Sequence, residues 1–118
     1  TNKEAHESLK KVGAEVIVLD HALKNERVDL CQLMQYLAFR EINEIHTECG
    51  QGLAGALISL QLVDEVVLYL APCFLGNQAQ GLFDLGEIAQ MKDRVNCHIV
   101  DVRTIGKDIR LTLTPEYL

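Results

Sequence analysis

Tryptophan is absent from this sequence, and aromatic residues make up only 5% of it, against 48% hydrophobic residues overall. A packed interior must therefore be built from Val, Ile, Leu and Ala, as in buried strands flanked by helices. The composition thus favours an α/β fold. At 118 residues, the chain is one domain or part of one. Charged residues at 24% leave an ordinary surface rather than a disordered chain.

Several other features are missing. The net charge is −6 and no dense Lys/Arg cluster occurs, so nucleic acid is not an expected partner. No Cys-x-x-Cys pair occurs, which argues against a zinc site and a compact disulfide framework; the cysteines are Cys31, Cys49, Cys73 and Cys97. No apolar run approaches the roughly 20 residues of a membrane span, and Thr1–Lys11 does not resemble a signal peptide. We expect a cytoplasmic protein with reduced thiols, no metal and no membrane partner.

Helices are predicted from apolar periodicity and from capping residues. The first covers Glu4–Val12 and ends at Gly13, since glycine readily adopts the left-handed cap. Asp29 is a predicted N-cap for a second helix that runs to Phe39 or Arg40. A third, apolar helix is expected from Leu53 to Leu60.

Strands are predicted where β-branched and apolar residues run together. The predicted strands are Ala14–Leu19, Glu44–Glu48, Val63–Leu70, Cys97–Arg103 and Ile109–Thr114. Ala71-Pro72 ends the third of these, and Phe74–Glu87 is expected to be irregular, with at most a short helix near Ala79. Gly106 marks a tight turn between the last two strands. Parallel βαβ units followed by an antiparallel hairpin are therefore expected.

The glycine-rich stretch Thr47–Ala56 lies between a predicted strand and a predicted helix, with the spacing Gly50-x-Gly52-x-x-Gly55. Glycines there allow close backbone approach, and a helix start presents free N–H groups to an anion such as a pyrophosphate. The spacing alone is a weak dinucleotide fingerprint, since no acidic residue stands at the end of the usual second strand. The other interpretation is a tight turn in which Ala54 and Gly55 allow close helix–sheet packing.

Three polar residues precede those glycines. Glu48 ends a predicted strand, where open α/β sheets bind ligands, and it either accepts substrate hydroxyls or is a solvated glutamate. His46 lies on the same face of that predicted strand as Glu48. It is either a ligand-binding residue or an ordinary packed histidine. Cys49 is either a low-pKa nucleophile at a helix start or a small space-filling residue.

One succession of motifs resembles a known family. Glu48-Cys49-Gly50 is followed by an Ala/Leu-rich helix, then by Leu62-Val63-Asp64-Glu65 and Ala71-Pro72-Cys73-Phe74-Leu75-Gly76. Gly106-x-Asp108-x-x-Leu111 closes the pattern. This order resembles the reductase domain of the bifunctional riboflavin-biosynthesis deaminase/reductase. It implies a dihydrofolate-reductase-like mixed sheet flanked by helices, with the C-terminal antiparallel hairpin.

The resemblance also implies an activity. Such domains reduce 5-amino-6-(5-phosphoribosylamino)uracil to its ribitylamino counterpart with hydride from NADPH. By position, Glu48 contacts the substrate's sugar, and the cofactor phosphates are held by Gly50, Gln51, Gly52, Leu53, Ala54, Gly55 and Ala56. The chain departs from the family at Cys49, where Gly or Ala is frequent, and at Gln51, where Pro or Gly is common.

The resemblance leads us to expect residues 1–118 to be the C-terminal part of a single reductase domain, trimmed before Thr1. The domain's first strands and a zinc deaminase domain would precede it, and the exposed sheet edge predicts a homo-oligomer. Two other functions stay open: an oligomerisation scaffold without activity, and a related dihydrofolate-reductase-like enzyme with another substrate.

Overall fold

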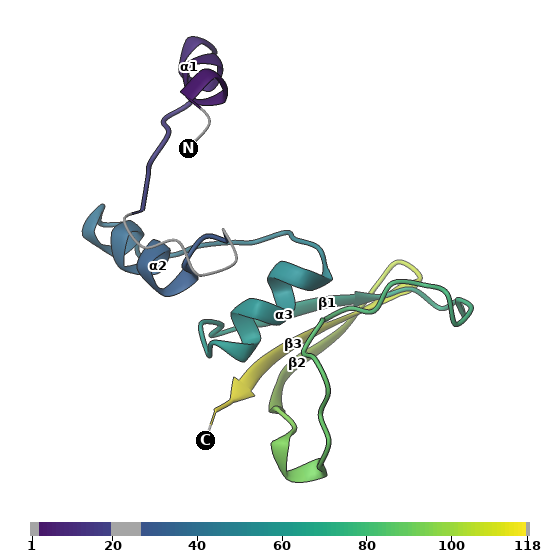
Figure 1. Cartoon of the computed structure of the whole chain (residues 1–118). Coiled ribbons are helices and arrows are strands. Elements are labelled where there is room, and N and C mark those ends of the chain that lie inside the picture. The colour runs from purple at the N-terminus through teal and green to yellow at the C-terminus, as the bar shows by residue number, and fades with distance from the viewer. Residues whose placement is uncertain (1–2, 20–26, 118) are drawn as a thin grey trace. The chain divides into compact units, whose positions relative to one another are not determined.

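The chain divides into two compact units, Thr1–Ile45 and His46–Leu118, in a computed structural model that describes residues 3–19 and 27–117. The first unit holds helices α1 (Lys3–Lys11) and α2 (Leu30–Phe39). The second holds helix α3 (Gln51–Ser59), the 3-10 turn η1 (Met91–Asp93) and a three-stranded sheet (Figure 1). No helix in these described ranges has the length and apolarity needed to cross a membrane.

The three predicted helices are confirmed. Asp29 is the N-cap of α2, and its carboxylate accepts a hydrogen bond from the Gln32 amide at 3.1 Å. Helix α3 begins two residues before the predicted Leu53, because Gly50 takes the N-cap position with extended backbone at φ −76° and ψ 169°. Gln51 and Gly52 thus belong to the first turn of α3 and not to a loop before it.

All three helices end in the same way. The first residue beyond each C-cap has positive φ: Gly13 at 85°, Glu41 at 60° and Gln61 at 57°. The next residue donates its amide to the carbonyl five positions back, as in a Schellman motif; the pairs are Ala14 to Leu9, Ile42 to Leu37 and Leu62 to Leu57. Only Gly13 was predicted, because the other two caps have no glycine to mark them.

The sheet consists of β1 (Val66–Leu70), β2 (Asn96–Ile105) and β3 (Asp108–Glu116), in the order β1-β3-β2. Both pairings are antiparallel, so the predicted C-terminal hairpin is confirmed. Ile105 pairs with Asp108 across the turn, where Gly106 has φ 62°. A positive φ at the first turn residue alone is the pattern of a II′ turn.

Two predicted strands are wrong. Ala14–Leu19 and Glu44–Glu48 have no regular secondary structure, so the sheet in the described residues is antiparallel throughout. A run of β-branched residues reports a preference for burial, but a strand also needs a partner for its N–H and C=O groups. Neither segment pairs with another described strand, so each stays irregular.

The chain between β1 and η1, residues 71–90, is irregular, and it includes the stretch Phe74–Glu87 that was predicted to be so. The short helix expected near Ala79 is a single turn, in which the Ala79 amide donates to the Gly76 carbonyl at 2.9 Å. We call residues 71–90 the connecting loop.

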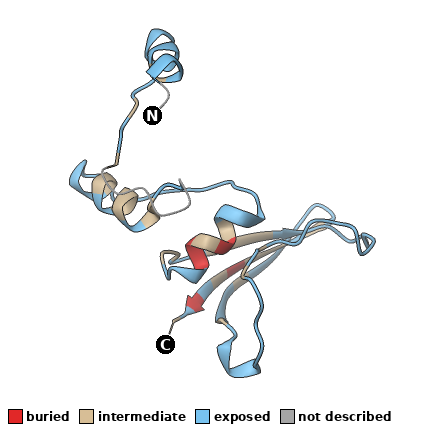
Figure 2. Cartoon of the chain, viewed as in Figure 1, coloured by how far each residue is buried: buried red, intermediate tan, exposed pale blue. Residues whose placement is uncertain are grey.

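Burial is concentrated in the second unit, on α3 and β3 (Figure 2). Leu57 and Ile58 of α3 are 5% and 7% exposed, and Thr112 of β3 is 5% exposed. Tyr117 adds a link between the end of β3 and the start of β1, since its hydroxyl donates to the Val63 carbonyl at 3.0 Å. These contacts leave the first turn of α3 at the surface.

Candidate functional site

The first turn of α3 offers unused backbone donors. The Ala54 amide bonds to the Gly50 carbonyl at 3.1 Å, whereas the amides of Gln51, Gly52 and Leu53 donate to no other described residue. The turn has no acidic side chain and no side-chain cap. Free amides at the positive end of a helix favour an anion, so this turn is the candidate site.

The glycines of the motif serve two different purposes. A Cβ placed on Gly50 or Gly52 would meet nothing within 4 Å, so the front of the turn is open. Gly55 is buried, and a Cβ there would overlap the backbone of Asp84 in the connecting loop. The packing interpretation of Gly55 therefore holds, but its partner is a loop and not the sheet.

The predicted cofactor residues divide by exposure. The first four, Gly50 to Leu53, are exposed at the front of the turn, while Ala54 and Ala56 are half-buried and Gly55 is buried. A ligand that approaches from solvent would therefore meet the first four residues directly.

Glu48 lies in solvent two residues before the N-cap. Its side chain is 89% exposed, and Oε1 is 3.6 Å from Nε2 of His46, which is 78% exposed. Such an exposed ion pair contributes roughly 0–1 kcal/mol when the histidine is protonated. Glu48 thus keeps its carboxylate free to accept hydrogen bonds from a ligand.

His46 has one potential metal ligand beside it, the carboxylate of Glu48. In the part of the chain that the structure describes, no group of three or more His, Cys, Asp or Glu side chains gathers in a way that would hold an ion. His46 and Glu48 supply two ligands where a structural or catalytic metal needs at least three protein ligands. Cys49 is exposed, with no base placed beside it among the described hydrogen bonds and ion pairs.

The connecting loop also touches this turn, which the sequence did not indicate. The Asp84 amide donates to the Gln51 carbonyl at 3.0 Å, and the Asp84 carboxylate accepts from the Gly86 amide at 3.4 Å. In the sequence, Asp84 resembled an ordinary surface acid. The one available signal was Gly55, since glycine inside a helix costs about 1 kcal/mol relative to alanine and often has a packing reason.

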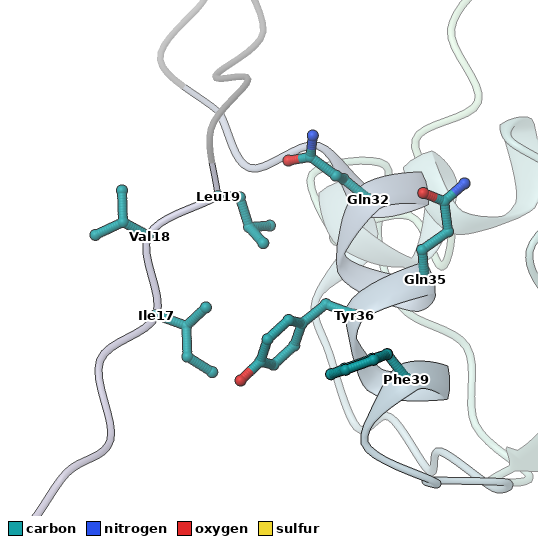
Figure 3. Close-up of a pocket in the computed structure, with 7 residues that line it drawn as sticks. All are labelled: Ile17, Val18, Leu19, Gln32, Gln35, Tyr36 and Phe39. Carbon is teal, nitrogen blue, oxygen red and sulfur yellow. The ribbon is translucent and has the colours of Figure 1, made fainter.

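A separate hollow of about 390 Å³ lies in the first unit (Figure 3). It is lined by Ile17, Val18, Leu19, Gln32, Gln35, Tyr36 and Phe39. Beside it, Nη1 of Arg40 bonds to the Tyr36 hydroxyl at 2.9 Å and to Glu15 at 2.8 Å. The pKa of Arg40 is raised above its usual value, mainly by the hydrogen bond with Tyr36 and then by the interaction with Glu15. The lining consists mainly of apolar side chains and two glutamine amides, and it includes none of the predicted site residues. We therefore assign no function to this hollow.

The chain is similar to proteins of riboflavin biosynthesis. The model of the RibD C-terminal domain matches residues 1–111. Riboflavin biosynthesis protein RibD of Haemophilus influenzae is 40% identical over 87 residues, which are 74% of this chain and 23% of that protein. The 5-amino-6-(5-phosphoribosylamino)uracil reductase of Buchnera aphidicola is 32% identical over 106 residues, which are 90% of this chain and 50% of that protein.

The solved structure of Acinetobacter baumannii RibD, form 2, is also similar, with a TM-score of 0.78 and 30% sequence identity. The match covers 93% of this chain and 29% of that one. This likeness confirms the dihydrofolate-reductase-like fold class expected from the sequence. The chain spans between 23% and 50% of the length of the two curated relatives above.

Proposed function

The chain belongs to the RibD C-terminal domain family, and from that membership we propose that residues 1–118 are the C-terminal part of one NADPH-dependent reductase domain. The substrate is 5-amino-6-(5-phosphoribosylamino)uracil, and the product is its ribitylamino counterpart. The name of the Buchnera relative supports this substrate. A nicotinamide cofactor is consistent with a family of reductases, and NADPH is the cofactor we propose.

The observation that carries this proposal is the first turn of α3. Its three free amides, its open front at Gly50 and Gly52, and its lack of acidic side chains suit the phosphates of a dinucleotide. Gly50, Gln51, Gly52 and Leu53 hold those phosphates, while Ala54, Gly55 and Ala56 shape the inner side of the same turn. The residues present therefore fit the cofactor.

When bound, NADPH supplies hydride to C1 of the substrate's sugar. The chain's own residues bind and orient the two partners. Glu48 stands two residues before the N-cap of α3 with an exposed carboxylate, so it accepts hydrogen bonds from sugar hydroxyls beside the cofactor. A hydrogen bond to a charged group contributes roughly 1.5–3 kcal/mol, which suits a substrate-binding role.

The full protein has further parts in this proposal. A zinc deaminase domain precedes the reductase domain, in line with the small share of the Haemophilus RibD that this chain covers. The protein works in the cytoplasm as a homo-oligomer. In the described residues β1 and β2 are the edges of the sheet, and unpaired strand edges favour association with another chain.

Turnover by the full-length gene product tests the function. We expect oxidation of NADPH that depends on the phosphoribosylamino substrate, with formation of the ribitylamino product. Glu48→Gln should raise KM for the substrate about tenfold or more, while the Kd of NADPH stays unchanged. NADPH oxidation that ignores this substrate would refute the reaction, and an unchanged KM in Glu48→Gln would refute the role of Glu48.

A further inference from the structure

The connecting loop contacts α3 at a position where the helix has a glycine and therefore no side chain. Gly55 is buried in the middle of the helix, and the peptide of Asp84 occupies the space that a Cβ would fill. Any larger residue at position 55 must push that backbone away, because backbone cannot swing aside as a flexible side chain can. We call this contact the Gly55–Asp84 seat.

Further contacts keep the loop in the same place. The Asp84 amide donates to the Gln51 carbonyl at 3.0 Å, so the seat reaches the first turn of α3. Within residues 71–90, the two residues that flank Asp84, Phe83 and Leu85, are half-buried, and all the others are exposed. The loop therefore runs beside the part of α3 between Gln51 and Gly55, next to the turn that carries the free amides.

We propose that Gly55 and Asp84 are positioning residues, and that their contact makes residues 82–86 of the connecting loop one wall of the cofactor site. The proposal rests on the proposed function for the identity of the cofactor. In this arrangement Gly55 contributes to NADPH binding through the loop and not by touching the phosphates. The seat limits the space beside Gln51, so a displaced loop leaves the cofactor held on one side only.

Hydrogen exchange in the full-length gene product, followed by mass spectrometry, tests the seat itself. Gly55→Ala is compared with Gly81→Ala, a control that adds the same methyl group in the connecting loop, at a position with room for it. We expect peptides over residues 82–86 to exchange about tenfold faster in Gly55→Ala only. The amides of β3 should stay protected in both variants. Equal exchange over residues 82–86 in the two variants would overturn the seat.

NADPH titration and steady-state kinetics of the same proteins test the wall. Gly55→Ala should raise Kd and KM for NADPH about tenfold with little change in kcat, and Gly81→Ala should match wild type. Faster exchange with an unchanged Kd would overturn the wall. If wild type itself does not bind NADPH, the proposed function fails, while the exchange comparison still decides the seat.

A second variant keeps the test decisive if Gly55→Ala loses the protection of β3. Asp84→Pro removes the amide that donates to the Gln51 carbonyl and leaves the sequence of α3 untouched. It should weaken NADPH binding to a similar extent. Wild-type affinity in Asp84→Pro would overturn the proposal.

Discussion

Gln61→Gly should stabilise the protein, because Gln61 ends α3 in a backbone conformation that suits glycine. Its φ is 57°, and its amide donates to the Ile58 carbonyl at 3.0 Å while that of Leu62 donates to Leu57 at 3.0 Å. A left-handed residue with a Cβ costs about 1–2 kcal/mol. Glycine offsets part of this gain by losing about 0.5–1 kcal/mol more entropy on folding. A net gain of about 0.5–1 kcal/mol follows.

Urea unfolding of the full-length gene product measures this gain. For an m-value of about 2 kcal/mol per M, the midpoint of the transition that includes α3 should rise by about 0.3–0.5 M with m unchanged. The control is Gln61→Ala, which removes the same exposed side chain but keeps the Cβ. Equal midpoints for the glycine and alanine variants would show that the positive φ of Gln61 carries no strain, and the reasoning would be refuted.

Two further predictions concern stability. Asp29→Ala should destabilise α2 by about 1 kcal/mol, since it removes the hydrogen bond to the Gln32 amide, and thermal unfolding should show Asp29→Asn close to wild type. Burial, above all, raises the pKa of Tyr117 above its usual 10.0, so its contribution to stability is fully present below pH 10.0 and is lost as pH rises through the folded-state pKa. Tyr117→Phe should therefore cost about 1 kcal/mol at neutral pH and flatten the loss of stability above pH 10.0; an unchanged alkaline unfolding curve would contradict this role.

Features with a local cause could be predicted from the sequence. Asp29 caps α2 because a carboxylate reaches an amide three residues on. Gly13 and Gly106 adopt positive φ where a helix ends and where a hairpin turns. Each depends on neighbours within a few residues, so the pattern contains the cause.

Features that depend on distant partners could not be predicted. The apolar pattern of Ala14–Leu19 does not say whether another strand pairs with it, and none of the described strands does. In the candidate site, the spacing located the glycine-rich turn correctly at the start of α3. Spacing did not reveal that Gly55 serves the connecting loop, because Asp84 lies far along the chain and the contact is made by its backbone.

Titration of the full-length gene product with NADPH tests the central claim that the first turn of α3 binds the cofactor phosphates. Gly52→Asp places a carboxylate in the open front of the turn and should weaken binding about 100-fold or more, since like charges about 4 Å apart repel strongly near a protein surface. Gln90→Asp adds the same charge just before η1 and should bind as wild type does. Equal affinity of wild type and Gly52→Asp would contradict the assignment of the cofactor to this turn.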